Sequence, residues 1–391
     1  MSLPAPAVPK KRRHFRRRVI LFCSLAALIS GCSSVGYYRQ AIGGQYEILA
    51  RREPIPELIA CADTRPALRE KLQLVLDIRE FAERELHLKT DGHYAEYADL
   101  GRRYVVWNVY AAPEFSLEPK RWWYPVVGRL KYRGFFSEKD ARVYGAQLAK
   151  EGYDVCVGGV DAYSTLGFFK DPVLNTFIHN EPADLAETLF HELAHQRVFA
   201  KGDTDFNEAF ATAVGEEGVR RWLAIHGDAK SRAEYELNLQ RQDQFVALVM
   251  NAREELRQLY GEESAHGPRL VQKPGSEPLV EAKRARKAEV ITKLRADYEK
   301  LKASWDGYAG YDNWFNRPIN NARLNTVATY QTLVPAFQQL LAQSGGDLRK
   351  FYADAKAIAN LDKEQRTERM AKLLGTAPET GVAAVTREGK D

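Results

Sequence analysis

Apolar residues recur at helical spacing over most of the chain and form strand-like runs in one region. The helical spacing covers residues 33–95, 181–226 and 230–305. Residues 103–136 and 154–160 are instead rich in β-branched and aromatic side chains, which favour strands. These patterns predict an α+β fold that is predominantly helical and contains a small β-sheet.

Two long, charged helical stretches predict an antiparallel hairpin. They cover Tyr235–Tyr260 and Glu281–Trp305, and glycine and proline residues interrupt the pattern between them. Changes in composition divide the chain into segments. These are residues 1–31, a targeting segment; 32–95, helical; 96–226, an α/β core; 227–305, the helical hairpin; 306–375, helical; and 376–391, a polar tail expected to be disordered.

The first 31 residues have the pattern of a signal peptide. Seven basic side chains precede an apolar run of eleven residues, Val19–Ile29. As a helix this run would measure about 16 Å, which is too short for a hydrocarbon core of about 30 Å. We therefore expect a signal peptide rather than a membrane-spanning helix.

The signal peptide ends in a sequence that resembles a bacterial lipobox. An aliphatic residue and two small residues, Ile29-Ser30-Gly31, precede Cys32. In such lipoproteins this cysteine is acylated and becomes the mature N-terminus. The alternative is an ordinary cleaved signal with an incidental cysteine. The resemblance implies contact with the membrane through a lipid anchor at Cys32, and Ser33 in place of an aspartate favours the outer membrane, facing the periplasm.

The charge of the chain argues against nucleic acid as a partner. The formal net charge is +5, but the seven basic residues of the signal peptide account for it, since 5 − 7 = −2. The mature chain therefore has no strong field that would attract phosphates. It retains Cys61 and Cys156, which could pair in an oxidising compartment or stay as separate thiols.

The motif His191-Glu192-Leu193-Ala194-His195 predicts a metal site. It lies in an apolar stretch, Asp184–Ala200, that we expect to form one helix. Residues four apart on a helix point the same way, so the two imidazoles can bind one ion. Glu192 lies beside them, where it can accept a proton from an activated water.

A catalytic zinc ion needs a third protein ligand and one open position. A metzincin would place a histidine where this chain has Lys201. Asp203 and Asp205 are possible carboxylate ligands. Glu208 is the favoured ligand, because it lies one turn into the next predicted helix and small residues follow it on the same face, which allows the two helices to approach closely.

The motif pair HExxH and NExxA resembles a gluzincin metallopeptidase, although the twelve residues between His195 and Glu208 are fewer than in the best-known gluzincins. A broader resemblance is to the bacterial lipoprotein family of predicted zinc aminopeptidases. It covers most of the mature chain and rests on the lipobox and on several further segments. These segments are Trp107–Ser116, Ala162–Gly167, Asp171–Leu174, His191–Gln196 and Phe206–Glu208.

The resemblance implies a Zn²⁺-dependent metallopeptidase acting on a peptide or protein substrate in the bacterial cell envelope, with residues 96–226 as its metallopeptidase core. His191, His195 and Glu208 would hold the metal, and Glu192 would be catalytic. The rival hypotheses are a zinc endopeptidase and a lipid-anchored structural or chaperone protein with a non-catalytic zinc site. The segment Tyr163–Phe169 could be an edge strand that pairs with substrate, or a structural strand and turn. The candidate donors to the oxyanion are Tyr163, Tyr308, Tyr311 and Arg323.

Overall fold

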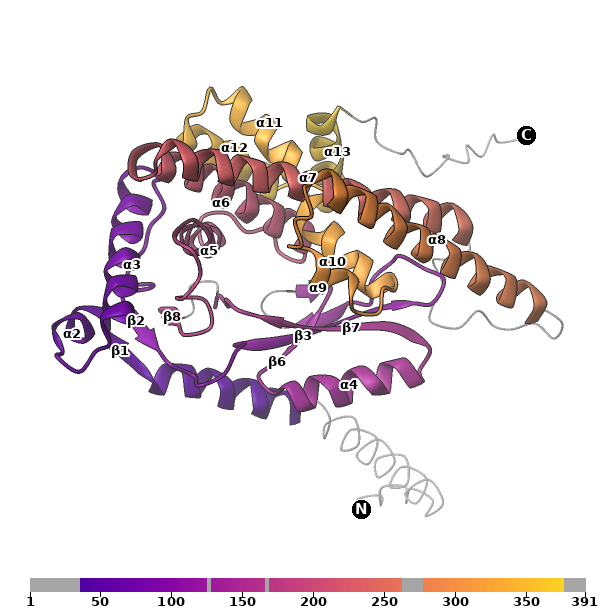
Figure 1. Cartoon of the computed structure of the whole chain (residues 1–391), viewed down its shortest axis with the longest axis horizontal. Coiled ribbons are helices and arrows are strands. Elements are labelled where there is room, and N and C mark those ends of the chain that lie inside the picture. The colour runs from indigo at the N-terminus through magenta and orange to yellow at the C-terminus, as the bar shows by residue number, and fades with distance from the viewer. Residues whose placement is uncertain (1–35, 125–127, 166–168, 262–276, 376–391) are drawn as a thin grey trace, which may run out of the picture.

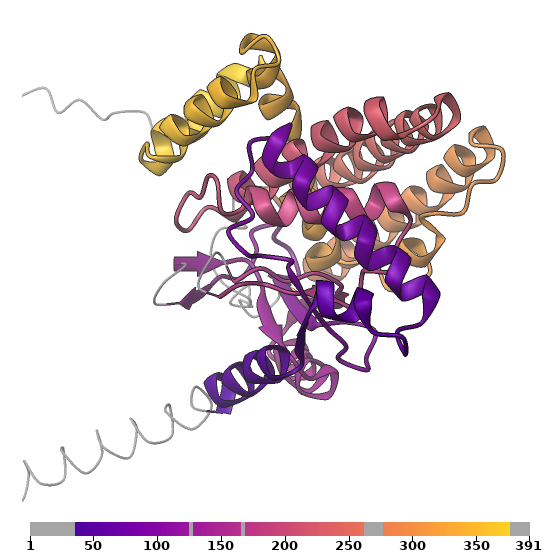
Figure 2. The same ribbon diagram turned by 90° about the vertical axis from the view of Figure 1, so that its left-hand side faces the viewer.

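Strands lie in the middle of the molecule, between two groups of helices (Figures 1 and 2). A helix at residues 36–50, called the N-terminal helix below, lies on one side of the strands together with α4 (Glu138–Lys150). The computed structural model describes residues 36–124, 128–165, 169–261 and 277–375. The signal peptide, Cys32 and the tail 376–391 lie outside the described residues.

The remaining helices confirm the predicted predominance of helix. Helix α5 (Pro182–Ala194), which carries the HExxH motif, and its neighbour α6 (Thr204–His226) pack against each other at the centre. The predicted hairpin is formed by α7 (Ala229–Tyr260) and α8 (Glu277–Ser304), which also pack together. The other helices are α2 (Ile55–Ala60), α3 (Pro66–Arg84), α9 (Asp312–Phe315), α10 (Asn321–Gln331), α11 (Val334–Gln343), α12 (Leu348–Ala359) and α13 (Lys363–Leu374).

The strands form small sheets rather than one. The order β6-β3-β7 is antiparallel throughout, and the order β1-β2-β8 joins an antiparallel pair to a parallel one; β4 and β5 form an antiparallel pair. Their bounds are β1 (Arg52–Pro54), β2 (Glu96–Ala98), β3 (Val106–Pro113), β4 (Trp122–Tyr124), β5 (Gly128–Leu130), β6 (Arg133–Phe135), β7 (Tyr153–Val160) and β8 (Val173–Leu174).

Helix α4 follows the local signals in its sequence. The Ser137 hydroxyl accepts a hydrogen bond from the Asp140 N–H and caps the helix. Gly152 turns the chain after the helix at a φ of 91°. The apolar face of α4 packs on β3 and β7 and buries Ala141 and Leu148. Helix α10 also packs on β3 and β7, and Val106, Asn108 and Val160 of these strands line the cavity described below.

The largest apolar core surrounds α5 and α6 and includes side chains from α3, α11 and α12. The ring of Phe337 contacts those of Phe206 and Phe210 edge to face, with ring centroids 4.9 and 5.6 Å apart. A second core joins α7, α8 and the aromatic residues near α9. The pair α5 and α6 is therefore supported by packing on several sides.

Cys61 is exposed and Cys156 is half-buried, and both are free thiols. None of the helices in the described part of the chain has the length and apolar character needed to cross a membrane.

Candidate metal centre

Helix α5 presents His191 and Glu192 on a face that borders a cavity. Its opposite face is buried through Leu185, Leu189 and Phe190. The helix is shorter than the predicted Asp184–Ala200, because it ends at Ala194 and a turn follows. His195 is the C-cap and keeps helical dihedral angles of −56° and −25°. Its ring therefore still faces that of His191, and the two Nε2 atoms lie 3.2 Å apart.

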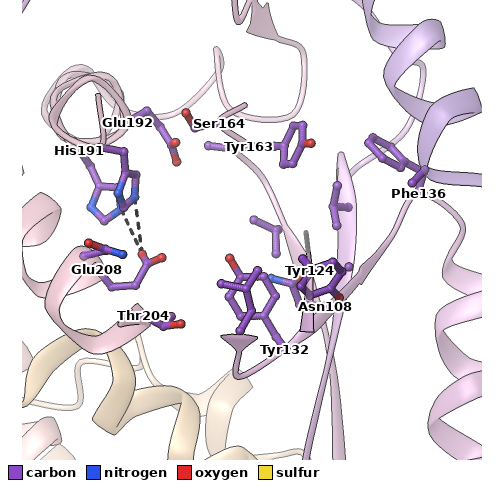
Figure 3. Close-up of a pocket in the computed structure, with 18 of the residues that line it drawn as sticks. Asn108, Tyr124, Tyr132, Phe136, Tyr163, Ser164, His191, Glu192, Thr204 and Glu208 are labelled. Atoms are coloured by element: carbon purple, nitrogen blue, oxygen red, sulfur yellow. Dashed lines mark hydrogen bonds and ion pairs between the residues drawn. The ribbon is translucent and has the colours of Figure 1, made fainter. Parts of the chain in front are cut away.

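Helix α6 brings Glu208 to the two histidines. Gly202 turns the chain at a φ of 75°, and the Asp203 carboxylate caps α6 by accepting a hydrogen bond from the Phe206 N–H. The Oε2 atom of Glu208 lies 3.5 Å from His191 Nε2 and 3.7 Å from His195 Nε2 (Figure 3). The structure thus brings together the three residues that the sequence predicts as metal ligands.

Two glycines allow α5 and α6 to approach. A Cβ atom on Gly215 would lie 3.3 Å from the backbone oxygen of Glu187 and 3.6 Å from Cβ of His191. A Cβ atom on Gly218 would lie 2.6 Å from the ring of Phe190. Larger residues would push α6, and with it Glu208, away from the histidines.

The three facing atoms have the spacing that one tetrahedral ion requires. With ligand bonds of about 2.0–2.1 Å, two ligands of a tetrahedral zinc ion lie about 3.3–3.4 Å apart. The distances between the facing atoms of His191, His195 and Glu208 are 3.2, 3.5 and 3.7 Å. Their nitrogen and carboxylate donors could hold a metal ion with little movement.

The competing carboxylates are engaged elsewhere. Asp203 forms an ion pair with Arg366 of α13 at 2.8 Å, in addition to capping α6. Asp205 forms an ion pair with Lys131. Neither belongs to the group of residues that could share an ion with the two histidines.

Asn207, the residue before Glu208, also has a defined place. Its side chain accepts a hydrogen bond from the Ala200 N–H at 2.7 Å and donates one to the Ala200 carbonyl at 2.9 Å. It thereby ties the segment after α5 to the first turn of α6. The sequence shows this asparagine only as part of the NExxA motif, because its contacts link residues seven positions apart.

Burial and mutual attraction set the charges of the group. Burial lowers the pKa of His195 to about 4, so its ring is neutral and available as a ligand at neutral pH. Burial alone would raise the pKa of Glu208, but the two histidines hold it below its ordinary value. Burial raises the pKa of Glu192 to about 7 against the opposing effect of His191. Glu192 can therefore exchange a proton near neutral pH.

A cavity of about 390 Å³ opens in front of these residues. Its wall opposite α5 includes Asn108 of β3, Tyr124 of β4 and Tyr132 between β5 and β6 (Figure 3). Tyr132 is close enough to Glu208 and Glu192 that both carboxylates, together with burial as the largest cause, raise its pKa well above the ordinary value. Tyr132 could not be identified from the sequence, because only the arrangement of β5 and β6 brings it into the same cavity as His191, His195 and Glu208.

The predicted oxyanion donors divide in two. Tyr163 lines the cavity, whereas Tyr308, Tyr311 and Arg323 do not. Tyr311 stacks on Phe245 with ring centroids 4.2 Å apart. The other two candidates make cation–π contacts: the Tyr308 ring lies under the guanidinium of Arg241, and Arg323 lies over the ring of Trp314.

The predicted substrate-pairing strand around Tyr163–Phe169 is wrong for its described part. Strand β7 ends at Val160, and residues 161–165 and 169–172 contain no strand. The Asp171 carboxylate accepts hydrogen bonds from the Thr165 N–H at 3.0 Å and from its hydroxyl at 2.7 Å. These bonds hold Thr165 against Asp171, and neither residue belongs to a strand.

Comparison with known proteins finds one family. The model of a family described as "Putative aminopeptidase" matches residues 36–370. No curated protein and no solved structure matches the chain.

Proposed function

Because the chain belongs to the putative aminopeptidase family, whose model matches residues 36–370, we propose that it is a zinc-dependent peptidase. The observation that carries this proposal is the group of His191, His195 and Glu208 beside Glu192 at the end of a cavity. A structural zinc site is normally closed by four protein ligands, whereas three ligands facing a cavity are typical of catalytic sites. This favours an enzyme over a lipid-anchored scaffold.

His191, His195 and Glu208 would hold the zinc ion. Zinc bound there would act as a Lewis acid on the scissile carbonyl and lower the pKa of a water molecule to about 7. The neutral state of His195 and the negative charge of Glu208 suit this role. Gly215 and Gly218 allow the close spacing of α5 and α6 on which the geometry of the three ligands depends.

Glu192 is the proposed general base and acid. Its pKa of about 7 lets it accept a proton from water and return it to the leaving amine at neutral pH. Tyr132 is the proposed hydrogen-bond donor to the oxyanion. Its raised pKa keeps the phenol protonated, and it lies across the cavity from Glu208 (Figure 3).

The test of this function separates metal binding from catalysis. We expect His191→Ala and His195→Ala to lose zinc, and Glu208→Ala to lose it to a lesser degree. Glu192→Gln should retain zinc and lose peptide hydrolysis by about 10²-fold or more. Metal content by atomic emission and cleavage of a mixed peptide library by mass spectrometry are the two measurements. Peptide hydrolysis that survives in Glu192→Gln would contradict the proposal.

The alternative of an endopeptidase has one observation in its favour. Among the described residues that line the cavity, the acidic side chains are Glu192 and Glu208, which already have roles at the metal. An aminopeptidase needs a charged anchor for the α-amine of its substrate. N-acetylation of a cleaved peptide should abolish turnover by an aminopeptidase, whereas equal kcat/KM for the two forms would identify an endopeptidase.

The place of action is a further part of the proposal. The lipobox at Cys32 supports a lipid-anchored protein of the bacterial cell envelope, attached to the outer membrane and facing the periplasm. A peptide or a protein segment in that compartment would be the substrate.

A further inference from the structure

The cavity extends from the proposed metal ligands His191, His195 and Glu208 to the N-terminal helix. The part of the cavity next to that helix, called the chamber below, is lined by aromatic side chains. Tyr37 and Ala41 of the N-terminal helix line it, as do Phe136 and Tyr163. The rings of Phe136 and Tyr163 meet edge to face, with centroids 5.8 Å apart. Figure 3 shows both residues on the side of the chamber away from His191.

The wall that the N-terminal helix contributes is held in place by specific contacts. The Tyr37 hydroxyl donates a hydrogen bond to the Tyr124 hydroxyl at 3.3 Å. The Phe136 N–H donates one to Gln40 Oε1 at 2.9 Å. Gly44 lies directly against Phe136, since a Cβ atom there would be 2.0 Å from the ring. The chamber is therefore formed before any ligand enters.

The chamber offers apolar surface and little charge. Val106, Leu130 and Val160 add aliphatic surface to the aromatic walls. The described residues that line the cavity include no lysine or arginine, and their carboxylates are the two at the metal group. A charged side chain entering the chamber would lose hydration without gaining a partner, whereas an apolar one would gain contact on several sides.

We propose that this chamber binds a bulky, uncharged apolar side chain of the substrate, aromatic or branched aliphatic, next to the bond that is cleaved. This proposal rests on the proposed peptidase function for the identity of the ligand. Ala41 is its specificity-determining residue, because its small side chain leaves the space between the N-terminal helix and the metal group open.

A binding experiment tests the chamber without catalysis. Full-length protein in detergent, freed of metal by a chelator, is titrated with N-acetyl-phenylalanine amide, N-acetyl-alanine amide and N-acetyl-lysine amide, and Kd is measured by ligand-observed NMR. The phenylalanine amide should bind on the order of tenfold or more tighter than the other two. Equal Kd values for the three would overturn the proposal.

Two neighbouring substitutions locate the binding. Ala41→Phe fills the chamber and should remove most of the preference for the phenylalanine amide. Ile42→Phe is the matched control, because Ile42 is the next residue of the same helix and is 70% exposed. The preference should persist in Ile42→Phe. An equal loss in both variants would place the binding elsewhere.

Turnover separates this proposal from the function on which it rests. The zinc-loaded protein is given peptides that differ only by Phe or Ala on one side of the cleaved bond, and then on the other. If the amides bind as expected but no peptide is cleaved, the chamber stands and the peptidase function fails. If peptides are cleaved without preference and the amides bind equally, the function stands and the chamber fails.

Discussion

The side-chain amide of Asn207 forms hydrogen bonds with both the N–H and the carbonyl of Ala200, at 2.7 and 2.9 Å. The asparagine is 5% exposed, so these bonds are shielded from water. They join the segment that follows His195 to the helix turn that carries Glu208. Asn207 thus helps to set the relative position of two proposed metal ligands, although it does not belong to the group that could hold the ion.

Asn207→Ala should weaken metal binding and stability together. Loss of the amide leaves the buried N–H of Ala200 unpaired and removes one of the two hydrogen bonds to its carbonyl, which also accepts from the Asp203 N–H. This costs about 1–3 kcal/mol of the free energy of unfolding. Supporting residues of metal ligands typically account for about 10–100-fold in affinity. Chelator competition and urea unfolding measure the two effects. Asn238→Ala, at an exposed position on α7, is the control and should change neither.

Asp203→Asn should reduce stability without removing the metal. The substitution keeps a side chain that can cap α6, but it removes the negative charge that pairs with Arg366 at 2.8 Å. Arg366 is 6% exposed, so its positive charge would be buried without a charged partner. An unpaired buried charge costs about 3–5 kcal/mol. Zinc stoichiometry should remain at the wild-type value. Loss of zinc at unchanged thermal stability would instead make Asp203 a ligand.

Glu216→Gln should stabilise the protein at neutral pH but not in acid. Burial, followed by the charge of Glu187, raises the pKa of Glu216 from 4.5 to about 7. Below the unfolded pKa both states are protonated, so the carboxyl has no effect. Between about 4.5 and 7 only the unfolded state ionises, and wild-type stability falls as pH rises.

The gain in Glu216→Gln should therefore grow over this interval and level off above pH 7, at no more than about 3 kcal/mol. Urea unfolding at a series of pH values measures it. Glu234→Gln, at an exposed position, should follow the wild-type curve. A gain that is equally large at pH 4 would show that the carboxyl charge is not its cause.

Tyr132→Phe should lower kcat and leave zinc content unchanged. The substitution removes the hydroxyl that we assign to the oxyanion while keeping the ring, and loss of one such donor typically costs about 10²–10³-fold in kcat. Steady-state kinetics on a cleaved peptide give the comparison. Tyr38→Phe, on the exposed side of the N-terminal helix, is the control. A change confined to KM would assign Tyr132 to substrate binding instead.

Cys32→Ser should abolish lipid anchoring. Without the thiol there is no site for the acyl chains, so the protein should remain unprocessed or become soluble. Phase separation in detergent, with antibody detection of the mature and precursor forms, distinguishes these outcomes. Cys61→Ser is the matched control and should partition as wild type does. A mature Cys32→Ser protein that still enters the detergent phase would exclude Cys32 as the anchor.

The metal group could be predicted from the sequence because its signals are local. His191 and His195 lie one turn apart, and Gly202 followed by a capping aspartate marks the start of the helix that carries Glu208. The helical hairpin was predictable for the same reason, since each of its two arms is a long stretch without glycine or proline.

The far wall of the cavity was not predictable, because it depends on contacts between distant segments. Tyr132 lies beside strands of three residues, whose pairing no local pattern determines. The residues around Tyr163 predict a strand, because they are aromatic and β-branched. The structure instead holds Thr165 by hydrogen bonds to the Asp171 carboxylate, six positions away along the chain.

The N-terminal helix supplies a wall of the substrate chamber and also begins directly after the proposed anchor. Between Cys32 and Tyr37 the chain can span at most about 18 Å even when fully extended. Tyr37 lines the chamber. An enzyme tethered in this way would have almost no reach: it would work on polypeptides that come to within a few nanometres of the lipid surface, and would leave those in the middle of the periplasm untouched.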